Sequence, residues 1–112
     1  MNVEALWSVA FSSTIGFAGA GVAVFETGRV FGGDSTMIYV GSYRVDGDVV
    51  KAEVKIEKYA HASGMVSVVG MDSFTLEVSG KLDIQKMHLH GHVKGRPDLT
   101  MEIEAVRRAE LP

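Results

Sequence analysis

The chain has 112 residues, of which 46% are hydrophobic and 22% charged, with a formal net charge of −3 and no cysteine. This length and composition are typical of one globular domain, and the lack of cysteine excludes a disulfide scaffold, a zinc finger and thiol catalysis. Lysine and arginine are spread along the chain, without the clustered positive charge that nucleic-acid binding needs. We expect a single domain over residues 1–112, no nucleic-acid partner and a cytoplasmic location, where an absence of cysteine is usual.

The first apolar stretch, residues 5–25, is long enough to be checked for a targeting or membrane segment. The first charge is Glu4, whereas a signal peptide begins with basic residues, and serine, threonine and glycine interrupt the run. We therefore expect no membrane segment, but two strands over 5–13 and 18–26 joined by a glycine-rich turn. The glycines of this turn lack the strand-then-helix context of a dinucleotide-binding loop.

Alternation of apolar and polar residues, the period of a half-buried strand, dominates the rest of the chain. It is clearest over 50–57, where valine, alanine and isoleucine alternate with lysine and glutamate. Turn sequences that tolerate a positive φ separate the runs, at Thr27-Gly28, Asp46-Gly47-Asp48, Ser79-Gly80-Lys81 and Gly95-Arg96-Pro97-Asp98. The strands expected around these turns cover 29–33, 37–46, 48–59, 71–79, 84–94 and 98–108.

About eight short strands in sequential hairpins predict an all-β fold, either a sandwich or an antiparallel barrel. Glycines within the strands, where barrels bend, favour the barrel, with at most a short helix near 60–69. A barrel of about eight strands is either filled by side chains or holds one small ligand. The residues that we expect to be largely buried are Trp7, Phe11, Val54, Ile56, Phe74, Leu76, Leu89, Met101 and Ile103.

Three histidines alternate along one expected strand, at His88, His90 and His92. Their spacing of about 6.8 Å lets two of them, but not easily all three, share a metal ion. On the next expected strand, the alternation places Glu102 and Glu104 on the outward face. His90 is therefore expected opposite one of these glutamates, which requires a bulge or an odd loop near Gly95. We expect a solvated ladder of side chains and no metal site.

The segment Gly32-Gly33-Asp34-Ser35 fits an Asx turn or an anion-binding nest, and a turn that leads into the next strand is the simpler interpretation. No serine, histidine and carboxylate stand in a known catalytic signature, and the chain has no phosphate-binding or calcium-binding loop motif. We therefore expect no enzyme activity and no cofactor.

Three segments together resemble a known family: residues 6–11 (Leu-Trp-Ser-Val-Ala-Phe), 28–43 with its Gly-Gly-Asp sequence, and 89–95 (Leu-His-Gly-His-Val-Lys-Gly). In this order they are similar to the GrlR-like family of bacterial regulators. The resemblance implies a small lipocalin-like barrel that forms a homodimer and holds a transcriptional activator by protein contact, without binding DNA. It also implies that an acidic hairpin loop makes this contact, which here points to Asp46 and Asp48.

Two functions remain open at this point. The leading expectation is a regulatory protein that sequesters a protein partner through a loop and a strand edge, and that self-associates through exposed positions such as Val40 and Val106. The alternative is a carrier that holds a small lipophilic molecule inside the barrel. An internal cavity of about 300 Å³ or more favours the carrier, whereas a filled interior with an exposed apolar patch favours protein contact.

Overall fold

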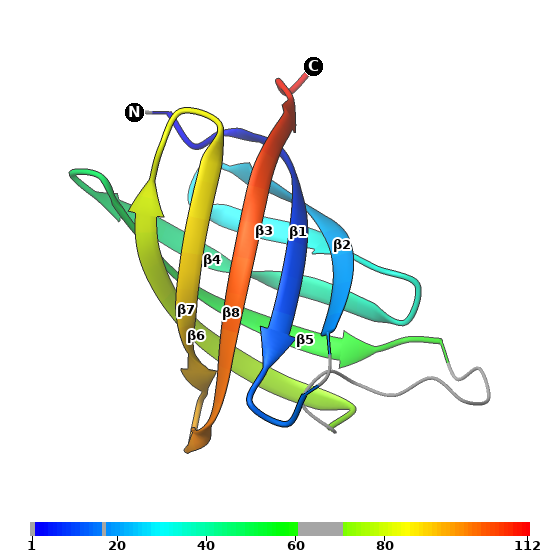
Figure 1. Ribbon diagram of the computed structural model, residues 1–112. Helices are drawn as coiled ribbons and strands as arrows, with labels where there is room; N and C mark the ends of the chain where they lie inside the picture. Colours follow the sequence, from blue (N-terminus) through cyan, green and yellow to red (C-terminus); the bar gives the residue numbers. More distant parts are fainter. Residues whose placement is uncertain (1, 17, 61–70) are drawn as a thin grey trace.

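The computed structural model describes residues 2–16, 18–60 and 71–112, and in these ranges the chain is all-β and forms a closed antiparallel barrel without a helix (Figure 1). Each strand pairs with the next, and the last returns to pair with the first. The predicted fold class is therefore confirmed. The strands are β1 (Ala5–Ser13), β2 (Ala18–Glu26), β3 (Arg29–Gly33), β4 (Met37–Asp46), β5 (Val49–Lys58), β6 (Ser73–Leu82), β7 (Lys86–Val93) and β8 (Arg96–Ala109).

Tight turns set the register of the early hairpins. Thr27 and Gly28, between β2 and β3, both have a positive φ, 52° and 77°, as expected of a two-residue hairpin turn whose twist matches the strands. Gly47 has a φ of 66° between β4 and β5. Because these turns lie where the sequence indicated them, the strands on either side keep their predicted apolar faces inside.

The turn predicted at Ser79-Gly80-Lys81 is wrong, because β6 continues through these residues to Leu82. A Cβ atom on Gly80 would lie only 1.8 Å from the carbonyl oxygen of His88 on β7. Glycine is therefore used here for the close approach of two strands, and not for a change of direction. The next turn follows at 83–85. Similarly, β8 begins at Arg96, directly after a turn at 94–95, instead of at 98.

The helix considered for residues 60–69 falls, apart from Ala60, outside the described residues, and Ala60 itself is not helical. The described ranges also contain no helix with the length and hydropathy needed to cross a membrane. Because β1 pairs with β8, the closed sheet leaves no edge strand in these ranges. Contact with a protein partner through a loop and a strand edge, expected from the sequence, stays a prediction.

One end of the barrel is plugged by the N-terminal segment. The indole Nε1 of Trp7 donates a hydrogen bond to the carbonyl oxygen of Val3 at 2.9 Å, and both residues are buried. The guanidinium of Arg107 lies 5.0 Å from the centre of the Trp7 ring and donates to the carbonyl oxygens of Asn2, Glu4 and Ile84. Both chain termini lie at this end (Figure 1).

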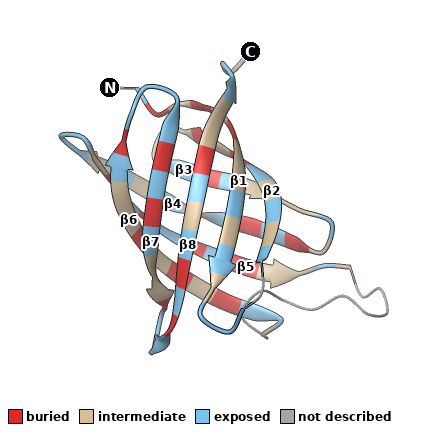
Figure 2. Cartoon of the chain, viewed as in Figure 1, coloured by how far each residue is buried: buried red, intermediate tan, exposed pale blue. Residues whose placement is uncertain are grey.

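Buried and exposed residues alternate along the strands, with the apolar core inside the barrel (Figure 2). Of the residues expected in the core, all are buried except Phe11 and Ile103, which are only half-buried. Both side chains border an internal cavity, and this is why part of their surface stays accessible.

Candidate functional site

The barrel interior is not filled: it contains a cavity of about 310 Å³ bordered by residues of all eight strands. The side of the cavity formed by β2 is lined by small residues, with Gly19 and Ala23 at inward positions. The half-buried Phe11 of β1, which also borders the cavity, lies opposite Gly19. Small inward residues on β2 leave space there that no side chain occupies.

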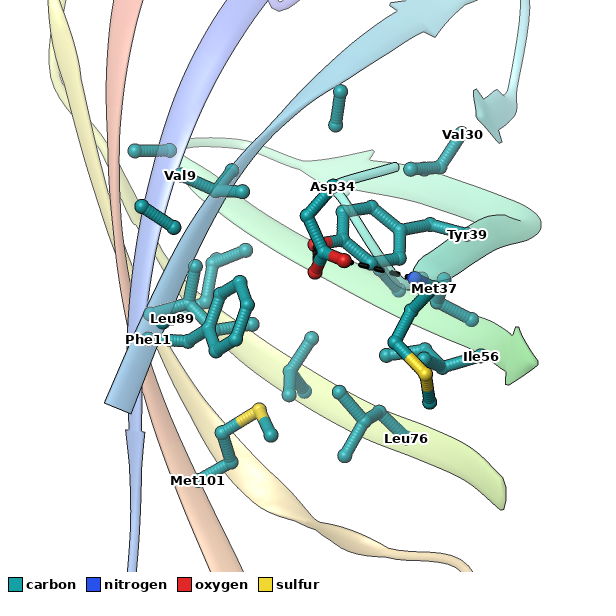
Figure 3. A pocket seen from close by; sticks show the side chains of 18 of the residues that line it. Val9, Phe11, Val30, Asp34, Met37, Tyr39, Ile56, Leu76, Leu89 and Met101 are labelled. Carbon is teal, nitrogen blue, oxygen red and sulfur yellow. Dashed lines mark hydrogen bonds between the residues drawn. The ribbon is translucent and has the colours of Figure 1, made fainter. Parts of the chain in front are cut away.

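In the part of the chain that the structure describes, the lining is apolar apart from the turn between β3 and β4 and Tyr39. These bring Asp34, Ser35, Thr36 and the Tyr39 hydroxyl to one side of the cavity. In Figure 3 the carboxylate of Asp34 points into the cavity beside the ring of Tyr39, across from Phe11. An apolar cavity with a few convergent polar groups is the usual composition of a small-molecule site.

Asp34 is held by an Asx turn, as its sequence context predicted. Its Oδ1 atom accepts hydrogen bonds from the main-chain N–H of Thr36 at 2.9 Å and of Met37 at 2.8 Å, and from the Thr36 hydroxyl at 3.2 Å. Its Oδ2 atom accepts a hydrogen bond from the hydroxyl of Tyr39. The exposed residue Tyr59 braces the turn, because its hydroxyl donates to the Asp34 carbonyl oxygen at 2.7 Å.

Gly21 makes room for this pair of side chains. A Cβ atom on Gly21 would lie 2.6 Å from the Tyr39 hydroxyl oxygen and 3.1 Å from the Cβ of Asp34. The sequence identified the Asp34 turn but not Tyr39 or Gly21 as part of a site. The sequence did hold a pattern that points to them: the alternation along each strand predicts that Tyr39 on β4 and Gly21 on β2 face the barrel interior.

At neutral pH the Asp34 carboxyl is ionised and the Tyr39 hydroxyl keeps its proton. Burial opposes ionisation of Asp34, but the hydrogen bonds from Tyr39, Thr36 and Met37 together outweigh it and lower the pKa of the carboxyl below its ordinary value. Burial, followed by the hydrogen bond to Asp34 and the negative charge there, raises the pKa of Tyr39. The cavity therefore holds a carboxylate beside a neutral phenol at neutral pH.

Asp46 and Asp48, the residues expected to contact a partner, lie at the opposite end of β4 from Asp34, on the exposed β4–β5 turn. Asp46 Oδ2 lies 3.7 Å from the Arg44 Nε and 3.8 Å from the Lys51 Nζ, and Asp48 Oδ2 lies 4.0 Å from the Lys81 Nζ. Two basic side chains thus lie near Asp46 and one near Asp48. Their contact with a partner stays a prediction.

The register predicted for the histidines is confirmed. His90 lies opposite Glu102, and a bulge follows His92, with Gly95 at a φ of 82°. The contacts, however, centre on His88, whose Nε2 lies 3.4 Å from Glu102 and whose Nδ1 lies 3.4 Å from Glu104. In the described ranges no three His, Asp or Glu side chains are placed to hold a metal ion.

His90 and His92 instead border a hollow on the outer face of β4–β7, together with Arg44, Lys51 and Glu77. This hollow is larger than the interior cavity, about 610 Å³, but it lies outside the sheet among polar, solvated side chains. We regard the interior cavity as the better site, because its lining is mainly apolar, which favours the burial of a ligand away from water.

A second surface feature is an apolar area on the outside of β2, β3 and β4, called here the outer apolar face. It consists of four exposed side chains: Val22 (49% exposed), Phe31 (40%), Ile38 (41%) and Val40 (58%). Phe31 and Val40 are direct cross-strand neighbours, so the exposed groups adjoin. Contiguous apolar patches of this kind often mark protein contacts.

No family model matches the chain, and no curated protein matches it significantly. What is established is therefore the fold, an eight-stranded closed antiparallel barrel, together with the geometry of its cavity.

Proposed function

We propose that this is a non-enzymatic binding protein whose barrel interior holds one small, largely apolar molecule. The observation that carries the proposal is the cavity of about 310 Å³, which lies at the lower end of the range of small-molecule sites, about 300–1,000 Å³. Burying an apolar ligand against this lining is favourable at about 25 cal/mol for each Å² removed from water. A cavity of this size favours the carrier, because a filled interior would leave no space for a ligand.

The direct test is titration with a neutral, apolar fluorescent probe, N-phenyl-1-naphthylamine, whose emission rises in an apolar environment. We expect saturable binding to the wild-type protein with one site per chain. Val9→Trp should weaken binding at least about tenfold, because Val9 lines the cavity and the indole would occupy ligand space. The matched control is Val40→Trp on the outer apolar face, which should leave the affinity unchanged.

Absence of saturable binding to the wild-type protein would overturn the proposal. Equal weakening by the two tryptophan substitutions would also count against it, since that result would place the probe on the outside of the barrel.

The second candidate is the function that the GrlR-like resemblance implies, sequestration of a protein partner. The outer apolar face supports it, and so does the exposed position of Asp46 and Asp48 on a projecting hairpin turn. The test is a pull-down from the native organism with the wild-type protein, Asp46→Asn/Asp48→Asn and Val40→Asp. A protein retained by the wild type and lost with either variant supports this function, and retention by all three contradicts it.

A further inference from the structure

The polar end of the cavity carries a negative charge that no basic side chain among the described lining residues balances. In the described ranges the residues that border the cavity include no lysine, arginine or histidine, whereas Asp34 is ionised and points inward (Figure 3). Asp34 is half-buried, so a ligand that fills the cavity would complete its burial. Burying an ionised group is unfavourable unless hydrogen bonds or an opposite charge compensate it.

The hydrogen bonds within the protein leave one acceptor position of Asp34 open. Oδ1 already accepts from three donors, two on Thr36 and one on Met37. Among the described residues Oδ2 accepts only from Tyr39, and a carboxylate oxygen can accept about two hydrogen bonds. Because the Tyr39 hydroxyl gives its only proton to Asp34, its oxygen also faces the cavity as an acceptor.

Among the described residues the polar end of the cavity thus offers two hydrogen-bond acceptors and no basic side chain. It therefore favours ligands that carry hydrogen-bond donors. A ligand without a donor removes water from the Asp34 carboxylate and leaves its open position unpaired, which weakens binding. A carboxylate ligand meets like charge in an apolar surrounding, which weakens binding further. A protonated amine supplies both the opposite charge and up to three N–H donors.

We propose that the ligand is a small lipophilic amine whose ammonium group binds between Asp34 Oδ2 and the Tyr39 hydroxyl oxygen while its apolar body occupies the cavity. This inference rests on the function proposed above and names the ligand class for the same site. The apolar body would extend from the β3–β4 turn toward Phe11, Leu76 and Met101 (Figure 3).

The experiment compares three ligands with the same ten-carbon chain, decylamine, decanol and decanoate, by displacement of N-phenyl-1-naphthylamine at neutral pH. For the wild-type protein we expect decylamine to bind at least about tenfold more tightly than decanol, and decanoate to bind most weakly. Because the ligands share one apolar body, this order reports the charge at the polar end of the cavity.

Asp34→Asn tests the assigned residue, since asparagine keeps an oxygen to accept from Thr36 and Met37 but removes the charge. We expect decylamine and decanol to bind this variant within about twofold of each other. Asp48→Asn is the matched control, because it removes the same charge from the outer surface. It should keep the wild-type preference for the amine.

The outcomes separate this inference from the function on which it rests. If the probe binds but decanol or decanoate matches decylamine, or if Asp34→Asn keeps the preference, the amine assignment is wrong and the carrier function stands. If the probe does not bind the wild-type protein, the carrier function and the amine assignment are both wrong. If Asp34→Asn does not fold, the order of the three ligands on the wild-type protein decides.

Discussion

At the scale of single residues, Asp34 shows what local sequence can and cannot predict. The sequence Gly-Gly-Asp-Ser predicts the Asx turn, because a short acceptor side chain bonds its own backbone over two or three residues. The bond from Tyr39 could not be predicted in this way. It depends on the curvature of the closed sheet and on the absence of a side chain at Gly21, and both arise only when the barrel forms.

The charge of Asp34 should make stability depend on acid pH. Its pKa in the folded protein lies below the ordinary value of 3.8, so the ionised carboxylate stabilises the fold above that pH. This contribution is lost as the pH falls through the lower, folded-state pKa. Between about pH 6 and about pH 2, we expect the urea midpoint of the wild type to fall further than that of Asp34→Asn. Parallel pH profiles for the two proteins would contradict this role of Asp34.

Gly21 should not tolerate even one methyl group. In Gly21→Ala the added carbon would lie 2.6 Å from the Tyr39 hydroxyl oxygen and 2.7 Å from the carbonyl oxygen of Gly33. We expect a loss of about 1–3 kcal/mol in the free energy of unfolding, measured by urea denaturation, because main-chain atoms must shift. Ala20→Ser, at the exposed neighbouring position, should change it by less than about 0.5 kcal/mol. An equal effect of the two substitutions would show that the contact at Gly21 is not the cause.

At the scale of the strands, the sequence predicts β1 to β4 to the residue, because alternation and turn glycines agree there. It fails at β6, where Gly80 serves strand contact instead of a turn. A glycine in a β protein has both uses, and local sequence does not distinguish them. The register of β7 against β8 was predictable, since residues of one face must pair with residues of the same face.

The histidine ladder between these two strands should contribute little to stability and should not depend on metal. The His88 side chain is about half exposed, and those of its partners Glu102 and Glu104 are 65% and 72% exposed. Exposed pairs of this kind contribute about 0.2–1 kcal/mol, so we expect His88→Ala to lower the free energy of unfolding by no more than this. Zinc should leave the melting temperature of the wild type unchanged. A zinc-dependent rise that disappears in His88→Ala would contradict this interpretation.

At the scale of the whole molecule, closure of the barrel separates an apolar interior from an outer surface that is also apolar over β2 to β4. The sequence left a filled and a hollow interior equally open. The alternation of apolar and polar residues shows which side chains point inward. Whether these side chains fill the interior depends on how large and small ones are placed opposite one another in the closed barrel. Here Gly19 and Ala23 of β2 border the same side of the interior, and a cavity results.

The outer apolar face should support self-association of the closed barrel. We expect sedimentation velocity at micromolar concentration to show a dimer for the wild type, because pairing would remove Phe31, Ile38 and Val40 from water. Val40→Asp should shift the protein toward the monomer by placing a charge in the contact. Val106→Asp, on the outside of β8, tests whether the contact extends there. A wild-type monomer at this concentration would contradict the expectation.

The most direct measurement of a ligand inside the barrel is methyl NMR of the protein labelled at its methionines, titrated with decylamine. Met37 and Met101 line the cavity, whereas Met87 is buried without bordering it. We expect saturable shifts of the Met37 and Met101 methyl signals with one common affinity, a smaller response from Met87, and loss of the effect in Val9→Trp. Methyl signals of Met37 and Met101 that do not respond at saturating decylamine would contradict the proposal that the barrel interior is the binding site.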